Sequence, residues 1–123
     1  MDKCVMIVED ELFVALAVGD TAEEVGLTVD GPYSTVSEAL KALEKARPDC
    51  AVLDVRLRDG EVYQVADTLH QMGVPIIFHS GHADEGELLA KYPRAVICGK
   101  PCSPSLLKRE LERASAGVVE KAG

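Results

Sequence analysis

Short apolar runs alternate with amphipathic segments along this chain of 123 residues. Four runs have the length of a strand and end at polar residues or glycine: Val5–Val8, Ala51–Leu53, Ile76–Phe78 and Ala95–Cys98. A weaker run, Leu27–Asp30, is typical of an edge strand. Because the four strong runs are continuous rather than alternating, they predict strands that are buried on both faces, as in a parallel sheet covered by helices.

The segments between these runs have apolar residues at helical spacing. Ser34 or Thr35 is the expected N-cap of the second helix, and Ser103 with Pro104 begins the last one, which extends to about Ala116. The fourth helix, between Gly81 and Arg94, is expected to be short or mobile, because it contains a glycine and a proline. The expected apolar stripes are Leu12, Leu16, Ala22 and Val25; Val36, Leu40 and Leu43; Val62, Val65, Ala66 and Leu69; Leu88, Leu89 and Ala90; and Leu106, Leu107 and Leu111.

Strand and helix therefore alternate five times, which predicts an α/β fold of the (βα)5 type, a doubly wound parallel five-stranded sheet with helices on both faces. The length fits one domain. We expect that domain to cover residues 1–117 and a tail to follow over residues 118–123.

The acidic balance of the chain changes the list of expected partners. There are 21 acidic and 13 basic residues, a formal net charge of -8, so DNA phosphates are not an expected ligand. Apolar runs are too short to span a membrane and the start lacks the features of a signal peptide, so a cytoplasmic location is expected. The four cysteines, Cys4, Cys50, Cys98 and Cys102, lack metal-binding spacing and are interpreted as structural thiols.

Chemically active side chains follow four of the expected strands. Glu9 and Asp10 follow the first strand, Asp54 the third, Ser80 the fourth and Lys100 the fifth. Ligands of open parallel sheets bind beyond the carboxyl ends of the strands, so these residues are expected to converge there. This convergence is the strongest functional signal in the sequence.

Adjacent carboxylates at one sheet edge need a compensating charge. Two like charges about 4 Å apart repel by roughly 4 kcal/mol at an effective dielectric constant of 20. Mg²⁺ prefers oxygen ligands and supplies that charge, while Lys100 pairs with Asp54 or with a phosphoryl oxygen and Ser80 offers a hydroxyl donor. A carboxylate nucleophile in such surroundings is suited to forming an aspartyl phosphate. The absence of a glycine-rich phosphate loop favours a protein phosphohistidine over a nucleotide as the donor.

The set Glu9-Asp10, Asp54, Ser80 and Lys100-Pro101 closely resembles that of response-regulator receiver domains, which are CheY-like, over essentially the whole chain. The resemblance implies the flavodoxin-like strand order 2-1-3-4-5, with Asp54 as phosphoacceptor in two-component signal transduction. It implies Mg²⁺ (or Mn²⁺) held by Asp10, Asp54 and the backbone carbonyl of Arg56, with Glu9 acting through water. It also implies a cis bond between Lys100 and Pro101. The protein would be a signalling phosphoacceptor rather than an enzyme, with self-phosphorylation and self-dephosphorylation alone expected.

Two departures refine the resemblance. The family's aromatic switch residue is replaced by Ile97, and Phe78-His79-Ser80-Gly81-His82 is similar to the motif of FATGUY receivers, often single-domain partners of HWE-type histidine kinases. The implied partners are a histidine kinase, with HWE-type as one candidate, or a phosphotransfer protein, and a downstream protein. The chain would act through such partners or drain phosphate from a kinase, and a homodimer stays open.

Other interpretations of the same residues are weaker. Glu9 to Glu11 fit a solvated helix start, and Asp54, Ser80 and Lys100 each fit a turn or surface position when taken alone. His79 and His82 are interpreted as loop or core histidines, because no third metal ligand is evident. The alternative function is a phosphorylation-independent pseudo-receiver that binds proteins. A flavodoxin-like cofactor binder or a small phosphohydrolase on this topology is less well supported.

Overall fold

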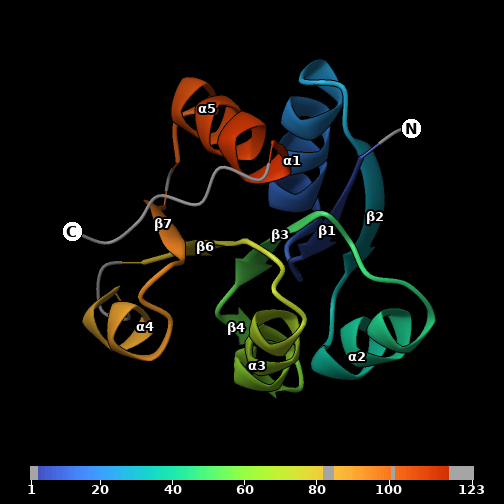
Figure 1. Ribbon diagram of the computed structural model, residues 1–123, viewed down its shortest axis with the longest axis vertical. Coiled ribbons are helices and arrows are strands. Elements are labelled where there is room, and N and C mark those ends of the chain that lie inside the picture. The colour runs from blue at the N-terminus through green and yellow to red at the C-terminus, as the bar shows by residue number, and fades with distance from the viewer. Residues whose placement is uncertain (1–2, 82–84, 101, 117–123) are drawn as a thin grey trace.

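The computed structural model describes residues 3–81, 85–100 and 102–116. Its main sheet consists of five parallel strands in the order β2-β1-β3-β6-β7. The helices form one layer on each face of this sheet (Figure 1). The strands are β1 (Cys4–Val8), β2 (Thr28–Tyr33), β3 (Cys50–Asp54), β6 (Ile76–Ser80) and β7 (Val96–Gly99), and the helices are α1 (Leu12–Glu24), α2 (Val36–Lys45), α3 (Tyr63–Gln71), α4 (Glu85–Lys91) and α5 (Pro104–Ser115).

A short antiparallel hairpin, β4 (Arg56–Leu57) and β5 (Gly60–Glu61), interrupts the alternation after β3. With this hairpin set aside, the strand order is the expected 2-1-3-4-5, and the expected α/β class is confirmed. The segment expected as an edge strand is β2, which lies at one edge of the sheet. The topology brings the carboxyl ends of β1, β3, β6 and β7 to the same side of the sheet.

Two cores separate the helix layers from the sheet. Strand residues on one face, such as Leu53 and Phe78, pack against α2, α3 and Leu88 of α4. Residues on the other face, such as Val52 and Ile77, pack against α1 and α5. Successive strand side chains point to opposite faces, so continuous apolar strands supply both cores at once.

The expected apolar stripe of α1 is wrong at two positions. Leu12 and Leu16 are 60% and 50% exposed, whereas Ala15 and Val18 are buried together with Ala22. The buried side of α1 carries small residues, and Gly19 adds to it, since a Cβ there would lie 3.9 Å from Ile7 Cδ1. Small residues allow the helix to approach the sheet closely, and the larger leucines are left on a neighbouring, solvent-facing side.

The first turn of α2 is capped from two directions. The Thr35 side chain accepts a hydrogen bond from the backbone N–H of Glu38, which identifies Thr35 rather than Ser34 as the N-cap. The carboxylate of Asp59, in the β4–β5 hairpin, accepts from the N–H groups of Val36 and Ser37. These bonds satisfy donors that a helix start cannot pair internally.

The other helices agree with their expected capping and length. The Ser103 side chain caps α5 by accepting from the N–H of Leu106, with proline at the first helical position. Helix α4 is short, as expected, with seven residues, and Leu88 is its buried side chain. None of the described helices is long and apolar enough to cross a membrane.

Some expectations lie outside the described residues. These are the cis bond from Lys100 to Pro101, the role of His82 and the tail over residues 118–123. The cysteines that the structure describes are free, and Cys50 and Cys98 are buried in the strand layer. Their burial agrees with structural thiols.

Replacing Thr35 with alanine removes one cap of α2. We expect Thr35→Ala to lower the free energy of unfolding by about 1 kcal/mol, because one helical N–H loses its side-chain acceptor. Urea unfolding followed by circular dichroism measures this. Ser37→Ala, at an exposed position of the same helix, is the matched control and should change stability by less than about 0.5 kcal/mol. Equal losses in the two variants would contradict the capping role.

Candidate functional site at the carboxyl ends of the strands

The fold brings the polar residues expected at the site to one edge of the sheet. Val8 of β1 pairs with Leu53 of β3, so Glu9 and Asp54 extend side by side from neighbouring strands. Asp54 pairs in turn with His79 of β6, and Ser80 pairs with Gly99 of β7, which Lys100 follows. The convergence expected from the sequence is therefore present as geometry.

Three carboxylates form a compact group at this edge. Glu9, Asp10 and Asp54 each offer an oxygen, and these oxygens lie within 4.8 Å of one another. Glu9 and Asp54 are buried and Asp10 is half-buried. Arg56 begins β4 two residues after Asp54. Oxygen ligands grouped in this way suit a hard divalent cation.

Lys100 lies across the carboxylates from the far strand. Its Nζ is 3.2 Å from Asp54 Oδ1, to which it donates a hydrogen bond, and 3.6 Å from Glu9 Oε1. Burial alone would lower the pKa of Lys100, but the Asp54 and Glu9 carboxylates outweigh it and raise that pKa. The lysine is therefore a fixed positive charge beside Asp54. Its backbone N–H also donates to the Ser80 carbonyl, which ties the ends of β6 and β7 together.

Ser80 lies at the end of β6 with its hydroxyl engaged locally. The side chain is buried, and its Oγ donates a 2.8 Å hydrogen bond to the carbonyl of Gly81. A hydroxyl can rotate to a new acceptor without moving the backbone. Ser80 is thus available to an anion bound at Asp54 after it releases Gly81.

The proximity of the carboxylates changes the pKa of Glu9. Burial first, and then the neighbouring Asp54, raise the pKa of Glu9 to about 7. The hydrogen bond from the N–H of Glu11 and the charge of Lys100 oppose this shift without cancelling it. The site is therefore crowded with negative charge, a condition that a bound cation relieves.

Sequence reasoning did not find every feature of this region. His79 is a buried core residue, as interpreted, but its position beside Glu9 depends on strand pairing that no local motif reveals. The exposed group formed by Leu12, Phe13 and Leu16 on α1 was also missed. Phe13 was the available signal in the sequence, because one side of a helix cannot bury its large side chain together with those of Leu12 and Leu16.

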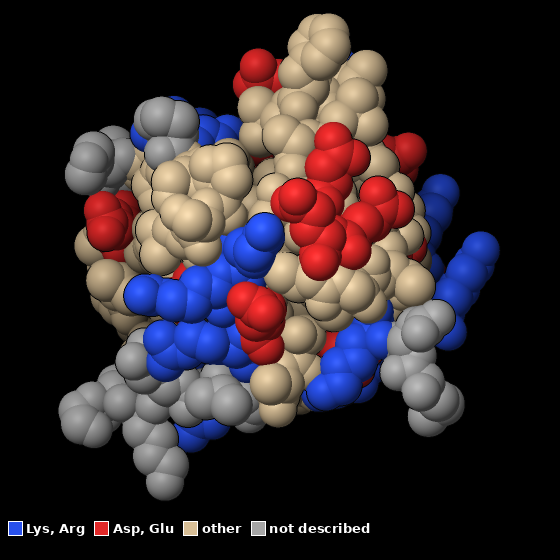
Figure 2. Space-filling view, turned by 90° about the horizontal axis from the view of Figure 1, so that it is seen from above, with Lys and Arg blue, Asp and Glu red and all other residues tan. Residues whose placement is uncertain are grey.

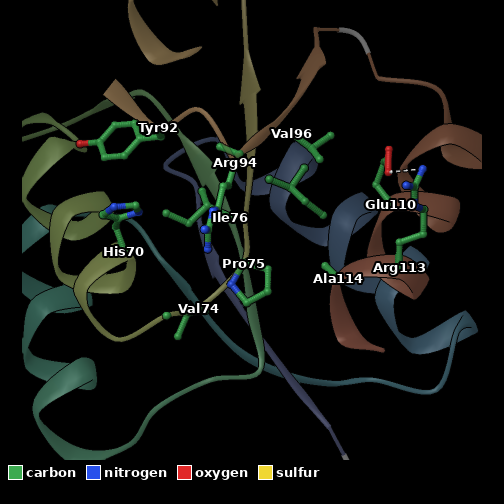
Figure 3. A pocket seen from close by; sticks show the side chains of 13 residues that line it. His70, Val74, Pro75, Ile76, Tyr92, Arg94, Val96, Glu110, Arg113 and Ala114 are labelled. Atoms are coloured by element: carbon green, nitrogen blue, oxygen red, sulfur yellow. Dashed lines mark ion pairs between the residues drawn. The ribbon is translucent and has the colours of Figure 1, made fainter. Parts of the chain in front are cut away.

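A separate cavity of about 110 Å³ lies at the opposite end of the sheet. It is lined by residues at the start of β6 and β7, including Pro75 and Val96, and by Glu110 and Arg113 of α5 (Figure 3). Arg113 Nη1 and Glu110 Oε1 form an ion pair at 3.8 Å. The cavity lies away from the carboxylates, because parallel strands place their two ends on opposite sides. It does not contribute to the acidic site.

The surface over α1 and α5 has a mixed charge. Figure 2 looks onto this layer and shows basic and acidic side chains in separate groups rather than one continuous basic face. Lys108 of α5 and Glu24 of α1 approach to 3.9 Å between these helices. Such exposed pairs contribute little to stability.

The raised pKa of Glu9 predicts a pH dependence of stability without divalent cations. Between the ordinary glutamate pKa of 4.5 and the folded value of about 7, the folded chain binds more protons than the unfolded chain, so the Glu9 contribution to stability falls as pH rises. Glu9→Gln removes this penalty. In EDTA, urea unfolding should therefore show the variant gaining stability relative to the wild type from pH 5 to pH 8. A pH-independent difference between the two proteins would contradict the assignment.

Comparison with known proteins agrees with this geometry. The response regulator receiver domain family matches residues 5–112. The phyllosphere-induced regulator PhyR of Methylorubrum extorquens is 29% identical over 113 residues, which cover 89% of this chain and 42% of PhyR. The chain thus spans less than half the length of that relative.

Solved structures share the fold. SdrG from Sphingomonas melonis Fr1 has a TM-score of 0.77, with 29% identity, covering 92% of this chain and 96% of SdrG. The receiver domain of the sensor histidine kinase PA1611 from Pseudomonas aeruginosa PAO1, which has magnesium coordinated in its active site cleft, has a TM-score of 0.80 with 20% identity, covering 94% of this chain and 99% of that domain. Together with the family match, the fold and the acidic edge lead to one conclusion: this chain belongs to the response regulator receiver domains of two-component signalling.

Proposed function

We propose that this receiver domain accepts a phosphoryl group on Asp54 from a histidine kinase or a phosphotransfer protein. The observation that carries the proposal is the position of Asp54, buried at the end of β3 between an acidic group and the Lys100 ammonium 3.2 Å away. The phosphorylated domain then acts through protein partners, or the domain drains phosphate from the kinase. A negative charge of about -1.5 to -2 added here would change the balance of the whole site.

Mg²⁺ is the proposed cation of the site. Asp10, Asp54 and the backbone carbonyl of Arg56 would hold it, and Glu9 would act through water. The mutual approach of three carboxylate oxygens within 4.8 Å and the raised pKa of Glu9 both fit a cation there. When bound, Mg²⁺ supplies positive charge that neutralises phosphoryl oxygens. Mn²⁺ has the same charge and accepts the same oxygen ligands.

Three side chains of the site have separate roles in phosphoryl transfer. An Asp54 oxygen attacks the phosphorus of a phosphohistidine, so a P–O bond forms as the P–N bond breaks, and the bond pair stays on the departing imidazole nitrogen. Lys100 turns from Asp54 to a phosphoryl oxygen and offsets its charge. Ser80 releases the Gly81 carbonyl and donates its hydroxyl to another phosphoryl oxygen. The protein contributes mainly alignment and charge neutralisation.

Replacing Asp54 tests this proposal directly. Asp54→Asn keeps the shape of the side chain but removes the nucleophilic carboxylate, so incubation with acetyl phosphate and Mg²⁺ should give no phosphorylated protein by intact mass spectrometry. The wild type and Asp20→Asn, an exposed acid on α1, should both be labelled, and EDTA should abolish labelling. An unlabelled wild type would favour the pseudo-receiver alternative, and a labelled Asp54→Asn variant would place the acceptor elsewhere.

The exposed start of α1 is the proposed contact surface for the phosphoryl donor. Leu12, Phe13 and Leu16 are 60%, 81% and 50% exposed, and α1 begins just after Glu9 and Asp10. A donor histidine has to reach bonding distance of Asp54, so the donor protein must cover the surface beside the site. Grouped exposed apolar side chains are typical of such contacts.

This contact surface separates protein donors from small ones. We expect Phe13→Ala to slow phosphotransfer from a purified histidine kinase by about tenfold, since truncating a central interface aromatic costs more than about 1 kcal/mol. Labelling by acetyl phosphate should be unchanged, because that donor needs no docking. Leu89→Ala, at a position 44% exposed on α4, is the matched control. Equal kinase rates for Phe13→Ala and the wild type would exclude this surface.

A further inference from the structure

His79 is a buried side chain of the site that the phosphotransfer scheme leaves unused. Only 8% of the residue is exposed, and among the described residues neither ring nitrogen has a hydrogen-bond partner. Buried polar groups in folded proteins are nearly always hydrogen-bonded, so two unpartnered nitrogens in one ring call for a physical reason. His79 extends from β6 directly beside Asp54 of β3, on the same face of the sheet.

The ring lies close to one atom of the acidic group. Although β3 lies between the strands that carry the two residues, His79 Nδ1 is 3.9 Å from Glu9 Oε1, which is too far for a hydrogen bond. The same Glu9 oxygen is 3.6 Å from Lys100 Nζ. Glu9 Oε1 therefore lies within 4 Å of both the Lys100 ammonium and the His79 imidazole.

The imidazole is suited to donate one hydrogen bond as a neutral group. Burial, and then the nearby positive Lys100, lower the pKa of His79, with Asp54 opposing them. A neutral imidazole carries one N–H and one lone pair, and either nitrogen can hold the proton. Protonation at Nδ1 would direct the N–H toward Glu9. Bringing the two atoms to about 2.9 Å, the usual N–H···O distance, needs a shift of roughly 1 Å.

We propose that His79 is a positioning residue for Glu9: its Nδ1–H holds the Glu9 carboxylate when Lys100 turns to a phosphoryl group on Asp54. The proposal rests on the phosphoacceptor function above. Without a phosphoryl group, Lys100 pairs with both Asp54 and Glu9. When it moves to the phosphoryl group, Glu9 Oε1 loses the ammonium beside it, and His79 is the adjacent donor that takes its place. His79 would thereby keep Glu9 oriented toward a cation that Glu9 would contact through water.

Two variants of His79 distinguish the effect of the hydrogen bond from the effect of the ring volume. His79→Phe keeps an aromatic ring without a donor, whereas His79→Asn keeps an N–H donor at the position that Nδ1 occupies. Beryllofluoride with Mg²⁺ mimics the phosphorylated state, and its affinity is read from the backbone amide signals of Ser80 and Lys100. His79→Phe should bind it roughly three- to tenfold more weakly, the size expected for one hydrogen bond. His79→Asn should recover most of that loss, and His70→Phe, at an exposed histidine near the other end of the sheet, should equal the wild type.

A spectroscopic measurement on the wild type needs no variant. With ¹⁵N-labelled histidine, beryllofluoride and Mg²⁺ should fix the proton of His79 on Nδ1 and slow its exchange with water. In Glu9→Ala that protected proton should be lost. Equal affinities of His79→Phe and the wild type, equal weakening of the Phe and Asn variants, or a proton fixed on Nε2 would each overturn the positioning role. Failure of the wild type to bind beryllofluoride would instead refute the phosphoacceptor function on which the role rests.

Discussion

The repulsion among the carboxylates of Glu9, Asp10 and Asp54 is the constraint on which the site depends. Like charges about 4 Å apart repel by roughly 4 kcal/mol at an effective dielectric constant of 20. The fold meets this cost in two ways. Lys100 is brought from the end of β7 to within 3.2 Å of Asp54, and the proton affinity of Glu9 rises to a pKa of about 7. A bound cation could therefore replace the proton of Glu9 or the Lys100 ammonium as the compensating charge.

The strand order makes that arrangement achievable. β3 lies between β1 and β6, so Asp54 has acids on one side and His79 on the other, while β7 delivers Lys100 from the far edge. The five strands of the main sheet, the helices between them and the residues at each strand end were predictable from the sequence, because continuous apolar runs mark buried strands. The short β4–β5 hairpin after β3 was not predicted. The order 2-1-3-4-5 followed from the family resemblance, since periodicity alone does not determine which strands are neighbours.

Features that depend on tertiary packing were not predictable in the same way. A helical stripe containing Leu12 and Leu16 satisfies the spacing rule, yet α1 packs through the smaller Ala15, Val18 and Ala22. Local spacing identifies an apolar helix side, but the distance to the sheet decides which side is buried. The same limit applies to His79. Its proximity to Glu9 joins residues from two strands that are separated by β3, and nothing near either residue in the sequence records it.

Ile97 stands where the family has an aromatic switch residue, so other aromatic side chains must make the ring contacts between the sheet and the helices. Phe78 shares a face of β6 with Ser80, and its ring packs 5.4 Å from that of Tyr92, just after α4. The Tyr92 hydroxyl donates a 2.6 Å hydrogen bond to Asp67 of α3. Within the described part of α4 the buried side chain is Leu88, so Tyr92 is a main anchor of this helix. The aromatic contact beside this helix thus joins Phe78 of β6 to Tyr92, while Ile97 of β7 pairs with Phe78 and packs against the same core.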